Sequence, residues 1–141
     1  MFTNQRLIRP TLACVARRVS PAFFHSSIVR RSGQILDGNH DTFDKMVIEA
    51  KGPVIVDFYA DWCGPCKALT PILEQVVKEN KKVDLVKLNT DENPDLAAKY
   101  KITSLPTVYA FHNGKSINHF IGVKPLGEIK AFVAKAASLS K

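Results

Sequence analysis

Hydrophobic and polar residues recur along the chain with two periods, one typical of helices and one typical of strands. Within 41–50 the apolar residues recur every three to four positions, which places them on one helical face. The run 54–59 is apolar and rich in β-branched residues, as in a strand buried at the centre of a sheet. The helical period returns over 66–80, and 83–88 predicts a second strand. The first half of this pattern therefore predicts strands and helices in alternation.

The following segment carries a helix start and a hairpin. Asn93, directly before a proline, predicts a helix start in which the asparagine side chain caps the first turn. An Asn-Gly pair at 113–114 is a strong signal for a tight hairpin between strands at 107–111 and 116–121. These two signals predict a helix followed by two antiparallel strands.

A last helix opens at Pro125 and completes the pattern. The residues of this helix predicted to face inward are Leu126, Ile129, Phe132 and Val133. The order of elements is then β-α-β-α-β-α-β-β-α. Such an order predicts an α/β fold, with a mixed sheet covered by helices on both faces.

Charge is distributed unevenly along the chain, whose formal net charge is +7. All six arginines lie before residue 32, whereas the first acidic residue is Asp37. From residue 33 onward the chain is close to neutral, because lysines and acidic residues nearly balance. We therefore expect no nucleic-acid partner for this part, since nucleic-acid-binding proteins present a concentrated basic surface.

The first 32 residues form a leader that is rich in arginine, contains serines and lacks acidic residues. Its apolar residues can line one face of a basic helix, although Pro10 interrupts it. This composition is typical of a mitochondrial transit peptide, and a secretory signal is disfavoured because arginines break every apolar run. We expect a transit peptide at 1–32 and a folded domain at 33–141. The alternative is a basic tail that binds nucleic acid or anionic lipid.

Cysteine usage points to redox chemistry. Cys14 lies in the leader, which leaves Cys63 and Cys66 as the only cysteines of the expected domain. Two cysteines three residues apart do not make a disulfide framework for a domain of this size. They also supply only half of the ligands of a tetrahedral zinc site, and the histidines show no metal-ligand spacing. No metal site is therefore predicted.

The two cysteines lie between a predicted strand and a predicted helix. Residues three apart on a helical turn are about 5–6 Å apart, which suits the Cα separation of a disulfide. Cys63 falls at the helix start, where unpaired N–H groups and the helix dipole stabilise a thiolate, the attacking species. Cys66, one turn later, suits a resolving role. The alternative is a pair of buried structural cysteines.

An aspartate interrupts the apolar strand before the cysteines. Burying the Asp57 carboxylate costs several kcal/mol unless it is paired or protonated. A desolvated carboxyl with a raised pKa can accept a proton from Cys66. Lys87, on the neighbouring predicted strand, is the expected partner of this charge. The alternatives are an exposed aspartate on an edge strand and a solvated surface lysine.

Several motifs follow one another in a fixed order around and beyond this site. They are Asp57-Phe58-Tyr59-Ala60-Asp61-Trp62-Cys63-Gly64-Pro65-Cys66-Lys67, Pro71, Lys87-Leu88-Asn89, Asp91, Asn93-Pro94, Leu105-Pro106-Thr107, Asn113-Gly114 and Gly122. In order and spacing they resemble the thioredoxin family over 36–137, and the chain is most similar to mitochondrial members. The resemblance implies the thioredoxin fold, a mixed five-stranded sheet flanked by four helices.

The resemblance also implies roles for individual residues. Pro106 matches the family's cis-proline, which brings the backbone of Leu105 alongside the sulfurs. Trp62, Leu105, Pro106 and Gly122 are expected to form an apolar rim where substrate docks. The dipeptide Gly64-Pro65 between the cysteines resembles that of reductants and is expected to tune the redox properties of the pair.

The resemblance implies a protein-disulfide reductase of the mitochondrial matrix that exchanges its dithiol with disulfide-containing proteins. An NADPH-dependent thioredoxin reductase is expected to recycle it, and peroxiredoxins are expected to receive its electrons. We expect a monomer. No bound cofactor is expected, because the sequence has no glycine-rich loop of the kind that holds phosphate groups. No membrane span is expected, because no apolar run is long enough. The alternatives are a thiol oxidase or isomerase and a non-catalytic binding subunit.

Overall fold

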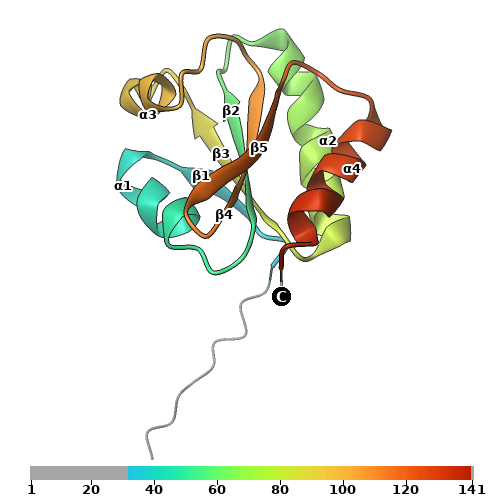
Figure 1. The fold of residues 1–141 in the computed structure, drawn as a ribbon. Coiled ribbons are helices and arrows are strands. Elements are labelled where there is room, and N and C mark those ends of the chain that lie inside the picture. Colours follow the sequence, from blue (N-terminus) through green and yellow to red (C-terminus); the bar gives the residue numbers. More distant parts are fainter. Residues whose placement is uncertain (1–31, 141) are drawn as a thin grey trace, which may run out of the picture.

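Five strands form one mixed sheet in the computed structural model, which describes residues 32–140 (Figure 1). They are β1 (Ile35–Gly38), β2 (Val54–Tyr59), β3 (Asp84–Asn89), β4 (Thr107–His112) and β5 (Lys115–Ile121). The order across the sheet is β1-β3-β2-β4-β5. Strands β1 and β2 run parallel to β3, whereas β4 is antiparallel to β2 and to β5. The predicted strand 54–59 is confirmed as the central strand β2.

Helices cover both faces of the sheet, as predicted (Figure 1). They are α1 (His40–Phe43), the π-helical turn η1 (Asp44–Ile48), α2 (Gly64–Asn80), α3 (Pro94–Lys99) and α4 (Leu126–Ala137). The single helix predicted over 41–50 is thus a short α-helix that continues as a π-helix. None of the described helices is both long and apolar enough to cross a membrane. The predicted transit peptide, apart from its last residue, and Cys14 lie outside the described residues.

Alternation along β2 separates two hydrophobic cores. Val54, Val56 and Phe58 pack on the side of α1, η1 and α3, whereas Ile55 packs on the side of α2 and α4. Successive side chains of a strand point to opposite faces, so Asp57 shares the face of Ile55. In β3 the same rule puts Lys87 on this face, next to the buried Leu85. The face of the sheet that α2 covers therefore changes from apolar to charged toward the C-terminal ends of β2 and β3.

Asn93 is not the side-chain cap that the sequence predicts. Its side-chain oxygen accepts a hydrogen bond from the backbone N–H of His40 (2.7 Å). Its amide donates to the backbone oxygen of Asn89 (2.9 Å). The buried side chain thus connects the start of α1 to the end of β3, and this tertiary use replaces local capping.

The last helix differs from prediction at its first residue. Ile129 and Val133 are fully buried, and Phe132 packs edge-to-face against Phe120 of β5. Leu126, which was predicted to face inward, is 48% exposed. It lies at the first position of α4, one turn before the helix reaches the core.

Candidate active site

Cys63 and Cys66 form a disulfide at the start of α2. Their Cα atoms are 5.4 Å apart, as expected for residues one helical turn apart. Cys63 is the N-cap residue, and its Sγ accepts a hydrogen bond from the backbone N–H of Cys66 (3.3 Å). An unpaired N–H at a helix start favours negative charge on the group it faces. The arrangement therefore directs a backbone N–H of the first helical turn at the Cys63 sulfur.

Exposed residues adjoin the buried disulfide in the first turn of α2. Gly64 and Pro65 are exposed, whereas Cys63 and Cys66 are themselves buried, at 4% and 2% exposed. A Cβ atom added at Gly64 would meet no atom of residues 32–140 within 4 Å, apart from its own chain neighbours and helix backbone. Among these residues, no neighbouring element therefore packs over Gly64.

Trp62 stands beside the disulfide as an exposed aromatic side chain. It is 72% exposed, the largest fraction among the exposed large hydrophobic residues of 32–140. Its indole Nε1–H donates to Oδ2 of Asp91 (2.9 Å). The backbone N–H of Asp91 in turn donates to the side-chain oxygen of Asn89, at the end of β3. The indole is therefore held in place by the sheet although its ring faces solvent.

The other predicted rim residues lie directly before β4 and directly after β5. The Leu105–Pro106 peptide is cis, and Leu105 packs against the cluster that contains both cysteines. The backbone N–H of Gly122 donates to the backbone oxygen of Pro106 (2.8 Å). Leu105 and Gly122 are half-buried, but Pro106 is buried, so its ring does not belong to an exposed rim.

Two exposed apolar residues of this surface were not predicted. Ile121 and Val123 flank Gly122 and are 52% and 49% exposed. Ile121 is the partner of Thr107 across β4 and β5, next to Pro106. The hairpin signal at 113–114 places β5 beside β4, but an irregularity in the pairing at Ala110 and Phe111 shifts the register by one residue, so the turn alone could not have indicated them.

Asp57 lies fully buried in β2, which rules out the exposed edge-strand alternative. The hydroxyl of Thr70 in α2 donates to its Oδ2 (2.8 Å). Burial raises the pKa of Asp57 from 3.8 to about 6. The Thr70 hydrogen bond and the positive charge of Lys87 oppose this rise, whereas the negative charge of Glu74 adds to it. Asp57 therefore titrates close to neutral pH.

Lys87 lies opposite Asp57 in the parallel pairing of β2 and β3, but it does not form the expected ion pair with it. Its Nζ lies 3.2 Å from an oxygen of Asp37 and 3.3 Å from an oxygen of Glu74. Burial lowers the pKa of Lys87, but these two carboxylates outweigh it and raise the pKa overall. The lysine therefore acts on Asp57 only through space.

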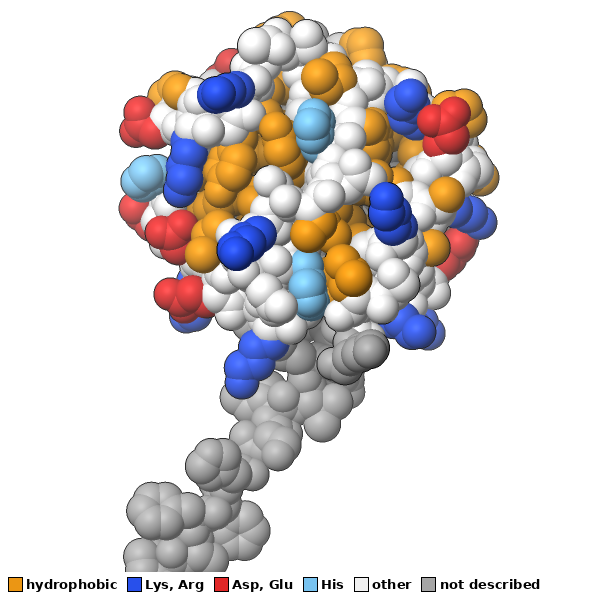
Figure 2. All heavy atoms as spheres, viewed as in Figure 1, with side chains coloured by type: hydrophobic (Ala, Val, Ile, Leu, Met, Phe, Trp, Pro, Cys, Tyr) orange, Lys and Arg blue, Asp and Glu red, His pale blue; other side chains and the backbone are white. Residues whose placement is uncertain are grey.

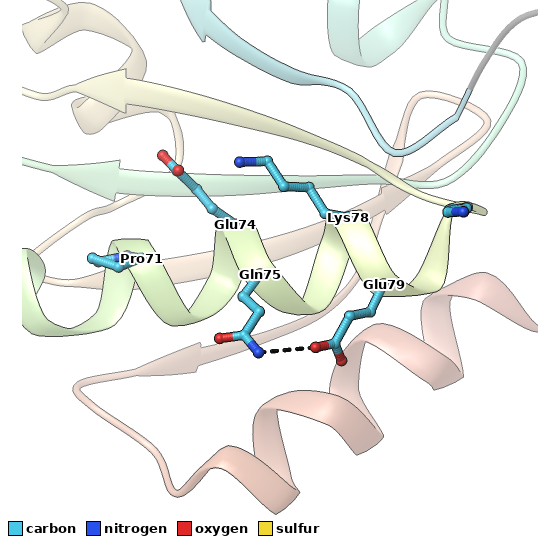
Figure 3. A pocket seen from close by; sticks show the side chains of 6 residues that line it. Pro71, Glu74, Gln75, Lys78 and Glu79 are labelled. Carbon is cyan, nitrogen blue, oxygen red and sulfur yellow. Dashed lines mark hydrogen bonds between the residues drawn. The ribbon is translucent and has the colours of Figure 1, made fainter.

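A hollow of about 280 Å³ opens beside the resolving position. Its lining residues are Tyr59, Ala60, Asp61, Cys66, Lys67, Thr70, Pro71 and Lys87. A larger hollow of about 640 Å³ follows the outer side of α2, where the side-chain amide of Gln75 donates to Glu79 (Figure 3). Neither cysteine lines the larger hollow. The smaller hollow is the one that adjoins the cysteine pair, because Cys66 lines it.

Charge and metal-ligating groups give no sign of a different kind of site. Lysine and acidic side chains are interspersed among apolar ones on the face shown in Figure 2. Within residues 32–140, no three His, Cys, Asp or Glu side chains cluster in a way that could hold a metal ion.

Comparison with known proteins agrees with this geometry. A family model described as thioredoxin matches residues 34–135. The chain belongs to the thioredoxin family. Membership, together with the Cys63–Cys66 pair at the start of α2, makes it a thiol–disulfide oxidoreductase.

Relatives with these features occur in bacteria and in two organelles. The chain is 39% identical over 139 residues to an M-type chloroplastic thioredoxin of Chlamydomonas reinhardtii, a match covering 88% of this chain and 98% of that protein. It is 44% identical over 96 residues to a thioredoxin of Rickettsia felis, covering 67% and 91%. It is 44% identical over 94 residues to the mitochondrial thioredoxin of Bos taurus, covering 66% and 57%. The organellar relatives are thus named for two different compartments.

Proposed function

We propose that the chain reduces disulfides in other proteins, with Cys63 as the attacking and Cys66 as the resolving cysteine. The observation that carries this proposal is the position of the pair. Cys63 caps the exposed start of α2, and its sulfur accepts the N–H of Cys66. An attacking sulfur needs a stabilised negative charge, and this position supplies it.

In the first step, the Cys63 thiolate attacks one sulfur of a substrate disulfide. A bond forms between Cys63 and that sulfur as the substrate S–S bond breaks, and the other substrate sulfur leaves as a thiolate. In this proposal Trp62, Leu105 and Gly122 supply the apolar surface on which a substrate segment docks, and the packing of Leu105 against the cysteine cluster supports it. Gly64 and Pro65 keep this turn short and open.

In the second step, Asp57 accepts the proton of the Cys66 thiol. The Cys66 thiolate then attacks the sulfur of Cys63, forming the intramolecular disulfide and expelling the second substrate sulfur as a thiolate. The substrate gains two electrons and the cysteine pair loses two. The product is the disulfide state found in this structure. Lys87 favours the ionised form of Asp57 through space, which makes Asp57 available as a base.

The oxidised pair needs a reductant before the next cycle. We assign this role to an NADPH-dependent thioredoxin reductase and expect peroxiredoxins among the proteins that receive the electrons. Family membership supports these partners. In this scheme the chain itself carries electrons on its two sulfurs alone and binds no cofactor.

The assignment of attacking and resolving cysteines is tested by replacing Cys66 with serine in a Cys14→Ser background. Cys63 can then attack insulin but nothing releases the product, so a covalent complex is expected to accumulate. A non-reducing gel detects the complex, and dithiothreitol should dissolve it. The matched control is the Cys63→Ser variant in the same background, which should form none. Trapping by the control variant alone would reverse the two roles.

We further propose that the chain works in the mitochondrial matrix, where it maintains thiol redox balance. The arginine-rich, acid-free leader and the mitochondrial relatives support this compartment. Residues 1–32 fused to a fluorescent protein are expected to direct it to mitochondria. Replacing the six leader arginines with glutamine should abolish import. Delivery to plastids, or retention in the cytosol by the native leader, would contradict the proposal.

A further inference from the structure

We propose that Thr70 is a positioning residue of the resolving step, whose hydroxyl holds one oxygen of Asp57 and leaves the other free to accept the Cys66 proton. This inference rests on the proposed function, in which Asp57 is the base. The hydroxyl acts through the carboxylate and does not touch the reacting sulfurs.

The position of Thr70 on α2 connects it to the sulfur pair. Thr70 follows Cys66 by four residues, so both side chains lie on one face of the helix, one turn apart. Both line the same 280 Å³ hollow, together with Lys87. The half-buried threonine thus stands directly below the resolving cysteine, on the face that α2 turns toward β2 and β3.

Thr70 contacts only one of the two carboxylate oxygens of Asp57. The Thr70 hydroxyl donates to Oδ2 of Asp57 at 2.8 Å. The other oxygen, Oδ1, is buried and has no hydrogen-bond partner among the described residues. Leaving a buried carboxylate oxygen without a partner is costly, and buried polar atoms are normally paired. A base needs an unpaired oxygen if it is to take up a proton, and Oδ1 is such an oxygen.

The charged groups around Asp57 leave Thr70 as its direct stabilising contact. From β3, Lys87 attracts the carboxylate through space, but its Nζ is paired with Asp37 of β1 and Glu74 of α2. Glu74 itself repels the Asp57 carboxylate. The remaining charged residues of the hollow are Asp61 and Lys67. The Thr70 hydrogen bond lowers the pKa of Asp57 more than Lys87 does.

A hydroxyl that donates to a carboxylate favours its ionised form. Removing the Thr70 hydroxyl is therefore expected to raise the pKa of Asp57 from about 6 by about one pH unit. At pH 6 the ionised fraction of Asp57 then falls about fivefold, whereas at pH 8 it barely changes. Proton transfer from Cys66 should be slowed in the same pH-dependent way.

The test compares Thr70→Val with Thr70→Ser in the full chain carrying Cys14→Ser. Valine keeps the shape without the donor, and serine keeps the donor. Rapid mixing of the reduced protein with a disulfide substrate separates mixed-disulfide formation from its resolution. For Thr70→Val, resolution is expected to be about fivefold slower at pH 6 and close to wild type at pH 8. Thr70→Ser should keep the wild-type profile, and the first phase should be unchanged in both variants.

Two further measurements separate positioning from a structural effect. Carbon-13 NMR of the Asp57 carboxyl in the oxidised protein should show the raised midpoint in Thr70→Val alone. In an Asp57→Asn background, Thr70→Val should change the rate equally at pH 6 and pH 8. A wild-type midpoint and pH profile in Thr70→Val, or the same slowing at both pH values, would overturn the role of Thr70. Absence of both kinetic phases in the wild type would instead refute the proposed function.

Discussion

Replacing Cys63 with serine is expected to abolish disulfide reduction, lowering the rate by about a thousandfold or more. A serine hydroxyl does not ionise near neutral pH and cannot form a bond that is later exchanged for another disulfide. The residual rate should be that of the reductant alone. Reduction of insulin, followed by precipitation of its free chains, measures the effect.

Circular dichroism of the Cys63→Ser variant serves as the control for folding. The sheet and helices should persist, because the disulfide closes a single turn of α2 and braces no distant elements. A variant that is folded and retains activity within tenfold of wild type would show that Cys63 is not the attacking group. Full biological function of a chain lacking both cysteines would favour a non-catalytic binding role.

Asp57→Asn is expected to stabilise the fold at neutral pH by about 3 kcal/mol. Folding raises the pKa of this carboxyl from 3.8 to about 6 by burying it. Between these pH values the folded chain keeps a proton that the unfolded chain has released. The free energy of unfolding therefore falls as the pH rises through this window, and it stays lower above it. Asparagine cannot ionise, so the variant does not lose this free energy of unfolding as the pH rises.

Urea unfolding of both proteins at pH 4 and pH 7 measures the effect. The stability gap should be small at pH 4 and reach its full size at pH 7. Asp95→Asn, which alters an exposed carboxyl, is the matched control and should change stability by about 0.5 kcal/mol or less. An equal gap at both pH values would show that packing, and not ionisation, distinguishes the Asp57 variant.

The sequence predicted those features that depend on local pattern. The bounds of β2 follow from one uninterrupted apolar run, and the β4–β5 hairpin follows from the Asn-Gly pair at 113–114. The placement of the cysteines at a helix start also follows from local pattern, because a strand ends just before them. Burial of Asp57 was predictable for a related reason, since its neighbours in the strand are all apolar.

Features that depend on residues distant in the sequence could not be predicted from the local pattern. The ion pairs of Lys87 come from β1 and from the middle of α2, and no local signal identifies which carboxylates meet it. Asn93 has the local features of a helix cap, but its side-chain oxygen accepts the N–H of His40, which is distant in the sequence. Leu126 fits the helical period, yet the first turn of α4 extends past the core. Tertiary geometry decides all three.

The role of Thr70 is an intermediate case. Its spacing of four residues from Cys66 was visible in the sequence, and it places both side chains on one helical face. Which strand residue lies beneath that face depends on how α2 crosses the sheet. Only the structure brings the hydroxyl to Asp57.

The hydrogen-bonded indole of Trp62 has a practical consequence. The chain contains one tryptophan, and it directly precedes Cys63 in the sequence. Disulfides quench the fluorescence of a nearby excited indole, whereas thiols quench it less. Emission from this ring is therefore an intrinsic optical signal of whether the neighbouring sulfurs are joined, and it needs no attached dye.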